Sequence, residues 1–180
     1  MRVITGEARG RRLVTLEGED VRPTTDRVKE GMFNIIQFDI EGALVLDLFS
    51  GSGQLGIEAL SRGARHCNFV DASNRSLDVT RENLKSVGFE KRASVFCGDA
   101  KMYVDLSRDK FDIALLDPPY NKKIIDAVLP SVASKMNDDG IIICESAFNE
   151  ILPEVAGEFK IDREYKYGKI KLTVYRKKSE

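Results

Sequence analysis

The chain has 180 residues, of which 42% are hydrophobic and 32% are charged, and its formal net charge at pH 7 is −1. This length corresponds to a single domain that can bury its own core, and the near-neutral charge excludes a histone-like tail and an acidic disordered chain. No apolar run reaches the roughly 18 residues that a membrane span requires, and no apolar segment follows the N-terminal arginines as in a signal peptide. We therefore expect a cytoplasmic protein with no membrane partner.

The first 40 residues indicate a small basic extension. Short β-like stretches at 3–4 and 13–15, on either side of Gly10, predict a hairpin. The segment RPTTD at 22–26 breaks this pattern and opens a helix. The apolar side chains that share one face of this helix are Val28, Met32, Ile35 and Ile36.

From residue 44 onward, short apolar runs alternate with helical patterns. The expected strands, in chain order, cover residues 44–49, 66–71, 93–99, 111–117 and 140–146. One intervening helix has Ser73 as its N-cap and ends at Gly88. Another covers about 124–136, with a kink or a restart expected at Pro130. Five alternations of this kind predict a parallel, doubly wound α/β sheet with right-handed crossovers.

The last part of the chain predicts a different pairing. Residues 159–167 and 169–177 alternate between apolar and polar side chains and indicate an antiparallel strand pair around Gly168. On a doubly wound sheet, ligands bind beyond the carboxyl ends of the parallel strands. The acids expected at that edge are Asp47, Asp71, Asp99 and Asp117.

The segment 51–56, GSGQLG, matches the pattern G-x-G-x-x-G, and Asp71 follows Gly51 by 20 residues. Such a loop lets the backbone approach a nucleoside-containing cofactor, whose ribose hydroxyls an acid can bind. Asp47 favours S-adenosylmethionine, because a diphosphate ~4 Å from this carboxylate would be repelled by roughly 4 kcal/mol. The sulfonium and ammonium of S-adenosylmethionine would instead be attracted. The alternative for Asp47 is a loop cap at the end of the strand.

Two further motifs follow later strands. Asp99 is placed to accept from the amine of an adenine, to cap a helix that starts at Ala100, or to do both. In the segment 117–120, DPPY, two prolines remove backbone donors, so that Asp117 and a main-chain carbonyl can accept from a planar exocyclic amine. Tyr120 offers a face on which a base can stack. The alternative is a proline-capped turn.

These motifs resemble class I S-adenosylmethionine-dependent methyltransferases that modify amines. More narrowly, the chain resembles the bacterial 16S rRNA (guanine-N2)-methyltransferases of the RsmD-like family. The similarity runs nearly from end to end, and the matching segments are MRVITGEARGRRL (1–13), RPTTDRVKEGMFNII (22–36), LDLFSGSGQLGIEALSRGA (46–64), FDIALLDPPY (111–120) and YGKIKLTVYRK (167–177). Gln54, where the family often has a small residue, and Gly31, inside the first helix, depart from the pattern.

The resemblance implies an α/β, Rossmann-like class I methyltransferase domain over 41–180. Its mostly parallel sheet would have seven strands and an antiparallel C-terminal pair, and residues 1–40 would form an RNA-facing hairpin and helix. The implied cofactor is S-adenosylmethionine, with contacts from Asp47, Phe49, Gly51, Ser52, Gly53, Asp71, Ala72, Asp99 and Ala100. The implied catalytic residues are Asp117, Pro118, Pro119 and Tyr120. The implied RNA-binding residues are Arg9, Arg11, Arg12, Arg22 and Arg27.

The implied reaction is methylation of the 2-amino group of one guanine in 16S rRNA, within a partly or fully assembled small ribosomal subunit, by a monomer. Thr24 would help to position the amino-acid end of the cofactor. An amine in DNA, another RNA or a protein amide is the alternative substrate, although a chain of this length lacks a separate DNA-recognition domain. A nicotinamide-dinucleotide oxidoreductase or a nucleotide-sensing module is a further alternative, against which Asp47 and the DPPY segment argue.

The cysteine and histidine content excludes other chemistry. Cys67, Cys97 and Cys144 are far apart and flanked by apolar residues, so we expect buried free thiols in a reducing compartment. His66 is the only histidine. We therefore expect neither a histidine-based metal site nor a Ser-His-Asp triad.

Overall fold

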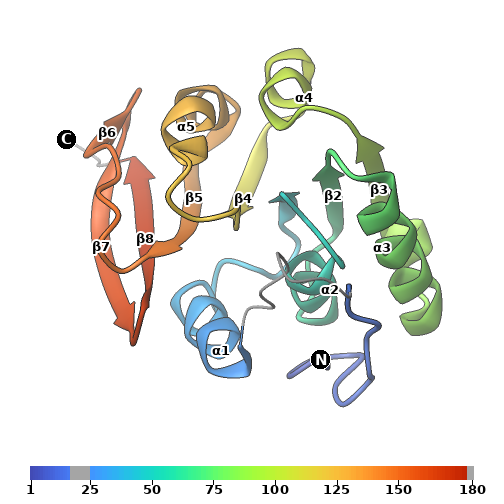
Figure 1. Cartoon of the computed structure of the whole chain (residues 1–180). Coiled ribbons are helices and arrows are strands. Elements are labelled where there is room, and N and C mark those ends of the chain that lie inside the picture. The colour runs from blue at the N-terminus through green and yellow to red at the C-terminus, as the bar shows by residue number, and fades with distance from the viewer. Residues whose placement is uncertain (17–24, 178–180) are drawn as a thin grey trace.

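The structure, a computed structural model that describes residues 1–16 and 25–177, contains one mixed sheet of the order β3-β2-β1-β4-β5-β8-β7-β6 (Figure 1). The strands are β1 (Leu44–Leu48), β2 (His66–Asp71), β3 (Ala93–Cys97), β4 (Phe111–Leu116), β5 (Met136–Ala147), β6 (Val155–Ala156), β7 (Phe159–Tyr167) and β8 (Ile170–Lys177). Strands β1 to β5 are parallel, and β8 runs antiparallel between β5 and β7. The predicted α/β architecture and its antiparallel C-terminal pair are confirmed.

The predicted number of strands was wrong by one. Strand β6 adds an eighth, because Val155 and Ala156 pair with the start of β7 at the outer edge of the sheet. Two residues are too few to show a periodic pattern in a sequence. In addition, β5 begins at Met136 instead of residue 140, and the irregular register between Phe111 and Ile113 of β4 accommodates this early start.

The helices cover both faces of the sheet (Figure 1). They are α1 (Asp26–Ile35), α2 (Gln54–Ser61), α3 (Asn74–Val87), α4 (Ala100–Leu106) and α5 (Ile124–Ser134), with a 3₁₀ turn, η1 (Glu90–Arg92). Helices α1, α2 and α3 pack on one face and α4 and α5 on the other. Ser73 caps α3 and Gly88 ends it, as predicted. Pro130 lies inside a continuous α5, so no restart occurs there.

Alternation along β1 divides its side chains between two cores. Val45 joins the core under α1, α2 and α3, whereas Leu46 and Leu48 join the core under α4 and α5. Because successive side chains of a strand point to opposite faces, this alternation directs Asp47 toward α2. Among the described residues, no helix has both the length and the apolarity needed to cross a bilayer.

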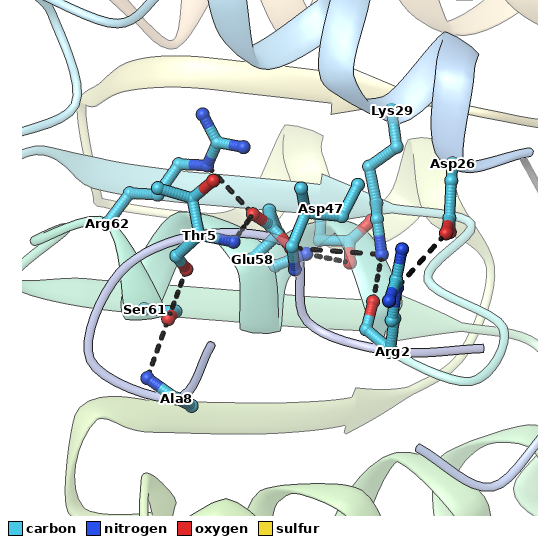
Figure 2. Close-up of polar contacts among 11 residues, drawn as sticks. Arg2, Thr5, Ala8, Asp26, Lys29, Asp47, Glu58, Ser61 and Arg62 are labelled. Atoms are coloured by element: carbon cyan, nitrogen blue, oxygen red, sulfur yellow. Dashed lines mark hydrogen bonds and ion pairs between the residues drawn. The ribbon is translucent and has the colours of Figure 1, made fainter. Parts of the chain in front are cut away.

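The predicted N-terminal hairpin is reduced to a single antiparallel bridge between Arg2 and Arg12. The reason lies in α2, where the buried carboxylate of Glu58 accepts hydrogen bonds from the backbone amides of Ile4 (2.8 Å) and Thr5 (3.0 Å). A side chain thus takes amides that a longer hairpin would use. Figure 2 shows this contact from α2 to the N-terminal segment.

Further contacts hold the same segment against α1 and α2 (Figure 2). Lys29 of α1 donates to the carbonyl of Arg2 at 2.6 Å and lies 3.7 Å from the Glu58 carboxylate. Both side chains are fully buried, and burial lowers the pKa of Lys29. Ser61 accepts from the amide of Ala8 at 2.9 Å. The N-terminal segment is therefore packed on the same core as α1, α2 and α3.

Two glycines permit close packing between elements. A Cβ at Gly31 of α1 would lie 2.2 Å from the hydroxyl of Tyr167, which explains why a poor helix former occupies this helix. A Cβ at Gly56 of α2 would lie 2.3 Å from the ring of Phe69 and 2.7 Å from the Sγ of Cys67. Phe69 and Cys67 are fully buried on β2, so α2 can approach the sheet this closely only with glycine at position 56.

We predict that Gly56→Ala destabilises the protein. Alanine favours helix, but the steric conflict with Phe69 and Cys67 should dominate and lower the free energy of unfolding by about 1–3 kcal/mol. Gly98→Ala is the matched control, because no atom lies within 4 Å of a Cβ there, and its effect should stay within about 0.5 kcal/mol. Urea denaturation checks both values. A Gly56→Ala variant as stable as the parent would contradict this packing.

Candidate active site

The candidate site lies where the chain changes direction across the sheet. Strands β2 and β3 follow β1 on one side, whereas β4 and β5 lie on its other side. Leu48 of β1 pairs in register with Leu116 of β4, so Phe49 and Asp117 are the next residues on these neighbouring strands. In open α/β sheets this switch point, at the carboxyl ends of the strands, is the usual ligand site. The structure thus brings the loop after β1 and the DPPY segment to one edge.

The loop between β1 and α2 has an unusual backbone. Phe49, Gly51 and Gly53 have φ values of +68°, +55° and +78°. A left-handed conformation is rare for a bulky residue such as phenylalanine and costs about 1–3 kcal/mol, and it is found mainly at functional sites. The amides of Phe49 and Ser50 both donate to the carbonyl of Val70, at 2.9 and 3.0 Å. The loop is therefore held against the end of β2.

Asp71, at the end of β2, joins two loops of this edge. One carboxylate oxygen accepts from the amide of Gly51 at 2.9 Å, and the other accepts from the amide of Ser73 at 2.9 Å. Each oxygen has a second lone pair for another donor. Ala72, which follows Asp71, is exposed, whereas Ser52 of the glycine loop is buried. Asp71 therefore lies beside the glycine loop, as the spacing of the motif predicts.

Asp47 lies beneath the glycine loop and is almost fully buried. Its Oδ2 accepts a hydrogen bond from the amide of Gly56, in the first turn of α2, at 2.8 Å. The N-cap of α2 is Gly53, which has no side chain to cap the helix, so Asp47 takes this role from the strand below. Burial raises the pKa of Asp47 to about 7, and the charge of Asp71 adds to this rise. The geometry thus matches the loop cap that the sequence analysis left open as an alternative.

Three buried polar atoms of this loop have no hydrogen-bond partner among the described residues: Asp47 Oδ1, Ser50 Oγ and Gln54 Oε1. Buried polar atoms are nearly always paired in proteins, so three within eight residues mark a candidate site for a ligand or for water. All three can accept hydrogen bonds. They fit a ligand with an ammonium group, such as S-adenosylmethionine, better than a diphosphate. Ser50 is not among the residues predicted from the sequence, and Gln54 is noted there only as a departure from the family pattern.

At the end of β3, Asp99 caps α4 by accepting from the amide of Met102 at 2.8 Å, which confirms the capping alternative. Asp99 also lines a cavity of about 460 Å³ between β3 and α4, together with Phe96, Met102 and Tyr103. Ala100 follows and is buried. The carboxylate can serve as a cap and face this cavity at once.

The cysteines differ in part from the prediction. Cys67 and Cys144 are buried free thiols, whereas Cys97 is free but exposed. Cys97 ends β3, one of the two edge strands, which pairs only with β2 among the described strands. Among the residues that the structure describes, no group of three or more histidine, cysteine or acidic side chains could hold a metal ion.

The DPPY segment follows β4 directly. Asp117 and Tyr120 are half-buried, Pro118 is buried and Pro119 is exposed. The hydroxyl of Tyr120 is hydrogen-bonded to the carboxylate of Glu145, near the end of the neighbouring strand β5. Glu145 is not among the residues predicted from the sequence. It lies 25 residues from Tyr120 in the chain, and only the pairing of β4 with β5 brings the two together.

Four of the predicted RNA-binding arginines are exposed: Arg9, Arg11 and Arg12 on the N-terminal segment and Arg27 on α1. Arg22 and Thr24 lie outside the described residues. The N-terminal segment also reaches the glycine loop. The side chain of Asn83 is buried. Its Oδ1 accepts a hydrogen bond from the backbone amide of Val14, and its Nδ2 donates to the carbonyl of Val14. The same Nδ2 donates to the carbonyl of Ser52 at 2.9 Å. The basic segment and the glycine loop are thus joined by one side chain.

The sheet order and the glycine loop at the switch point fit an S-adenosylmethionine-dependent methyltransferase, the class that similar proteins define, and S-adenosylmethionine is its cofactor. The comparison with known proteins agrees and is more specific. The chain belongs to the family described as Conserved hypothetical protein 95, which matches residues 1–176.

Relatives in this family are named as methyltransferases. The chain is 39% identical to "Putative rRNA methyltransferase YlbH" of Bacillus subtilis (strain 168), over 99% of this chain and 100% of the relative. It is 29% identical to "Ribosomal RNA small subunit methyltransferase D" of Escherichia coli (strain K12), over 100% of this chain and 91% of the relative. The solved structure "Putative methyltransferase yhhF from Escherichia coli" has a TM-score of 0.88 and 29% identity, and covers 100% of this chain and 99% of that one. The predicted RsmD-like family is confirmed.

We predict that Asp47 makes stability depend on pH. Because its pKa is about 7 in the folded protein and near 4 in an unfolded chain, the folded state binds the proton more tightly. The free energy of unfolding should therefore fall as the pH rises through this window. Asp47→Asn lacks the ionisation, so its stability relative to the parent should rise by roughly 3 kcal/mol between pH 5 and pH 8. Asp126→Asn, on the exposed side of α5, is the control. A difference between Asp47→Asn and the parent that stays constant with pH would contradict the burial of this charge.

Proposed function

We propose that the protein transfers a methyl group from S-adenosylmethionine to the exocyclic N2 amine of a guanine in 16S rRNA of the small ribosomal subunit. One observation carries the proposal, namely that the DPPY segment lies next to the glycine loop at the switch point of the sheet. The name of the Escherichia coli relative, a small subunit rRNA methyltransferase, supports the choice of substrate.

In the proposed reaction, Asp117 and a main-chain carbonyl of the DPPY segment accept hydrogen bonds from the two N–H groups of the amine. Holding both N–H bonds directs the nitrogen lone pair toward the methyl group, and the face of Tyr120 supports the base. When bound, S-adenosylmethionine supplies an electrophilic methyl group that leaves sulfur as the carbon–nitrogen bond forms. The nitrogen then releases a proton to Asp117 or to water. Positioning, rather than a strong base, supplies most of the rate.

The cofactor contacts in this proposal follow the glycine loop. Asp71 receives the ribose hydroxyls, and Asp99 faces the adenine from the end of β3. Phe49, Gly51, Ser52 and Gly53 contribute backbone, with Ala72 and Ala100 flanking the nucleoside. Ser50 and Gln54 are added to the predicted set. Their side-chain oxygens and Oδ1 of Asp47 have no partner in the described part of the chain, and all three are acceptors suited to the ammonium end of the cofactor.

The substrate side of the proposal rests on positive charge and on access to the base. Arg9, Arg11, Arg12 and Arg27 are exposed and are suited to contact phosphates. The guanine must leave any base pair for its amine to reach the site. A chain of 180 residues offers a limited docking surface, so we expect an assembled or partly assembled subunit to be methylated faster than protein-free rRNA.

We predict that Asp117→Ala removes methyl transfer and leaves cofactor binding nearly intact. The variant loses an acceptor for the amine, so the rate should fall more than about a hundredfold, while the glycine loop is unchanged. The measurements are transfer of radiolabelled methyl to small subunits from cells that lack the gene, and calorimetry with S-adenosylhomocysteine. Asp126→Ala is the control. Equal loss of methyl transfer and of cofactor binding would contradict the role of Asp117. Radiolabel found on DNA or protein instead of on a guanine would contradict the proposed substrate.

We also predict that the paired substitution Arg9→Ala and Arg12→Ala weakens binding of the small subunit roughly tenfold and reduces the dependence of binding on salt. The affinity for S-adenosylhomocysteine should not change, because neither side chain belongs to the glycine loop. The KM for subunits, measured at several salt concentrations, checks the first expectation. Arg81→Ala, an exposed arginine of α3 paired with Asp78, is the control. An unchanged KM would exclude these arginines from the RNA surface.

A further inference from the structure

We infer that Glu145 is a positioning residue that holds the ring of Tyr120 in place for the target base. The inference rests on the proposed function, because it deepens the role of the DPPY segment. It assigns a task to a buried acid near the carboxyl end of β5 that neither the glycine loop nor the DPPY motif includes.

The position of Glu145 follows from the sheet. Strand β5 lies beside β4, so the end of β5 reaches the same edge as the DPPY segment. Ile141 and Ile143 of β5 face the core under α1, α2 and α3, and alternation directs Glu145 to the same face. Across the β5–β8 pair, Glu145 lies in register with Leu172 of β8, and Leu172 belongs to that core. A carboxylate is thus placed at the rim of an apolar layer.

The burial of this acid requires a reason. Only 2% of Glu145 is exposed, and a buried carboxylate is costly unless its oxygens accept hydrogen bonds. The hydroxyl of Tyr120 donates such a bond to Oε1. This hydrogen bond fixes the far end of the Tyr120 side chain.

The tether matters because the loop that carries Tyr120 is irregular. Asn121 and Lys123, just after Tyr120, have positive φ values of 58° and 52°. The ring of Tyr120 packs against the core under α1, α2 and α3 on one side. With its hydroxyl held by Glu145 and one side packed, the ring keeps one orientation before any substrate binds. A stacking surface that is ordered in advance brings the amine to its reacting position without further loss of entropy.

A double-mutant cycle on methylation of small subunits tests the inference. Tyr120→Phe keeps the ring and removes the donor, and Glu145→Leu keeps the volume and removes the acceptor. Each should lower kcat about tenfold with little change in KM, and the double variant should be no slower than either single variant. Glu145→Gln, which retains an acceptor oxygen, should recover kcat to within about threefold of the parent. Tyr165→Phe, at another half-buried tyrosine on the same core, is the control and should be unchanged.

Each outcome decides the inference. Thermal unfolding and the affinity for S-adenosylhomocysteine, both expected to match the parent, separate positioning from a general loss of fold. Effects that add in the double variant, or a Glu145→Gln variant as slow as Glu145→Leu, would overturn it. An effect on KM alone would also overturn it, because it would place Glu145 in substrate binding. Failure of the parent enzyme to methylate small subunits would instead overturn the proposed function.

Discussion

The hydrogen bond between a buried carboxylate and the first turn of α2 is the interaction on which the rest of the site depends. Asp47 belongs to β1, and its bond to the amide of Gly56 holds the start of α2 against the sheet. The loop between them can then keep the left-handed backbone of Phe49, Gly51 and Gly53. On its outer side, α2 holds the basic N-terminal segment through Glu58 (Figure 2). One helix therefore holds both the loop proposed to bind the cofactor and the segment proposed to meet RNA.

This arrangement carries a cost in stability. A bulky residue in a left-handed conformation and an acid with a raised pKa both fall between residues 47 and 54. The same stretch holds three buried polar atoms that have no hydrogen-bond partner within residues 1–16 and 25–177. Each feature would be unfavourable in a purely structural loop. Strain of this kind is concentrated where a protein acts, and the surrounding layers of apolar side chains offset it.

Most of the fold could be predicted from the sequence because its signals are local. Apolar runs such as 140–146, and glycines such as Gly88, define strands and helix ends without reference to neighbours in space. The N-terminal hairpin could not be predicted correctly, because Glu58, more than 50 residues away, takes the amides of Ile4 and Thr5. Glu145 was missed for the same reason: an acid near the end of a strand has no local signature, and its contact with Tyr120 exists only once β4 and β5 are paired.

The place of β8 in the sheet has a consequence for the order in which the protein matures. Residues 170–177 follow every other strand that the structure describes, yet they pair along β5 and separate it from β7. Until they leave the ribosomal tunnel, the nascent chain exposes one edge of β5, including the strand end that carries Glu145. The rim of the candidate site is therefore completed only after β8 has been translated, and a chain interrupted before β8 would leave this edge of β5 uncovered.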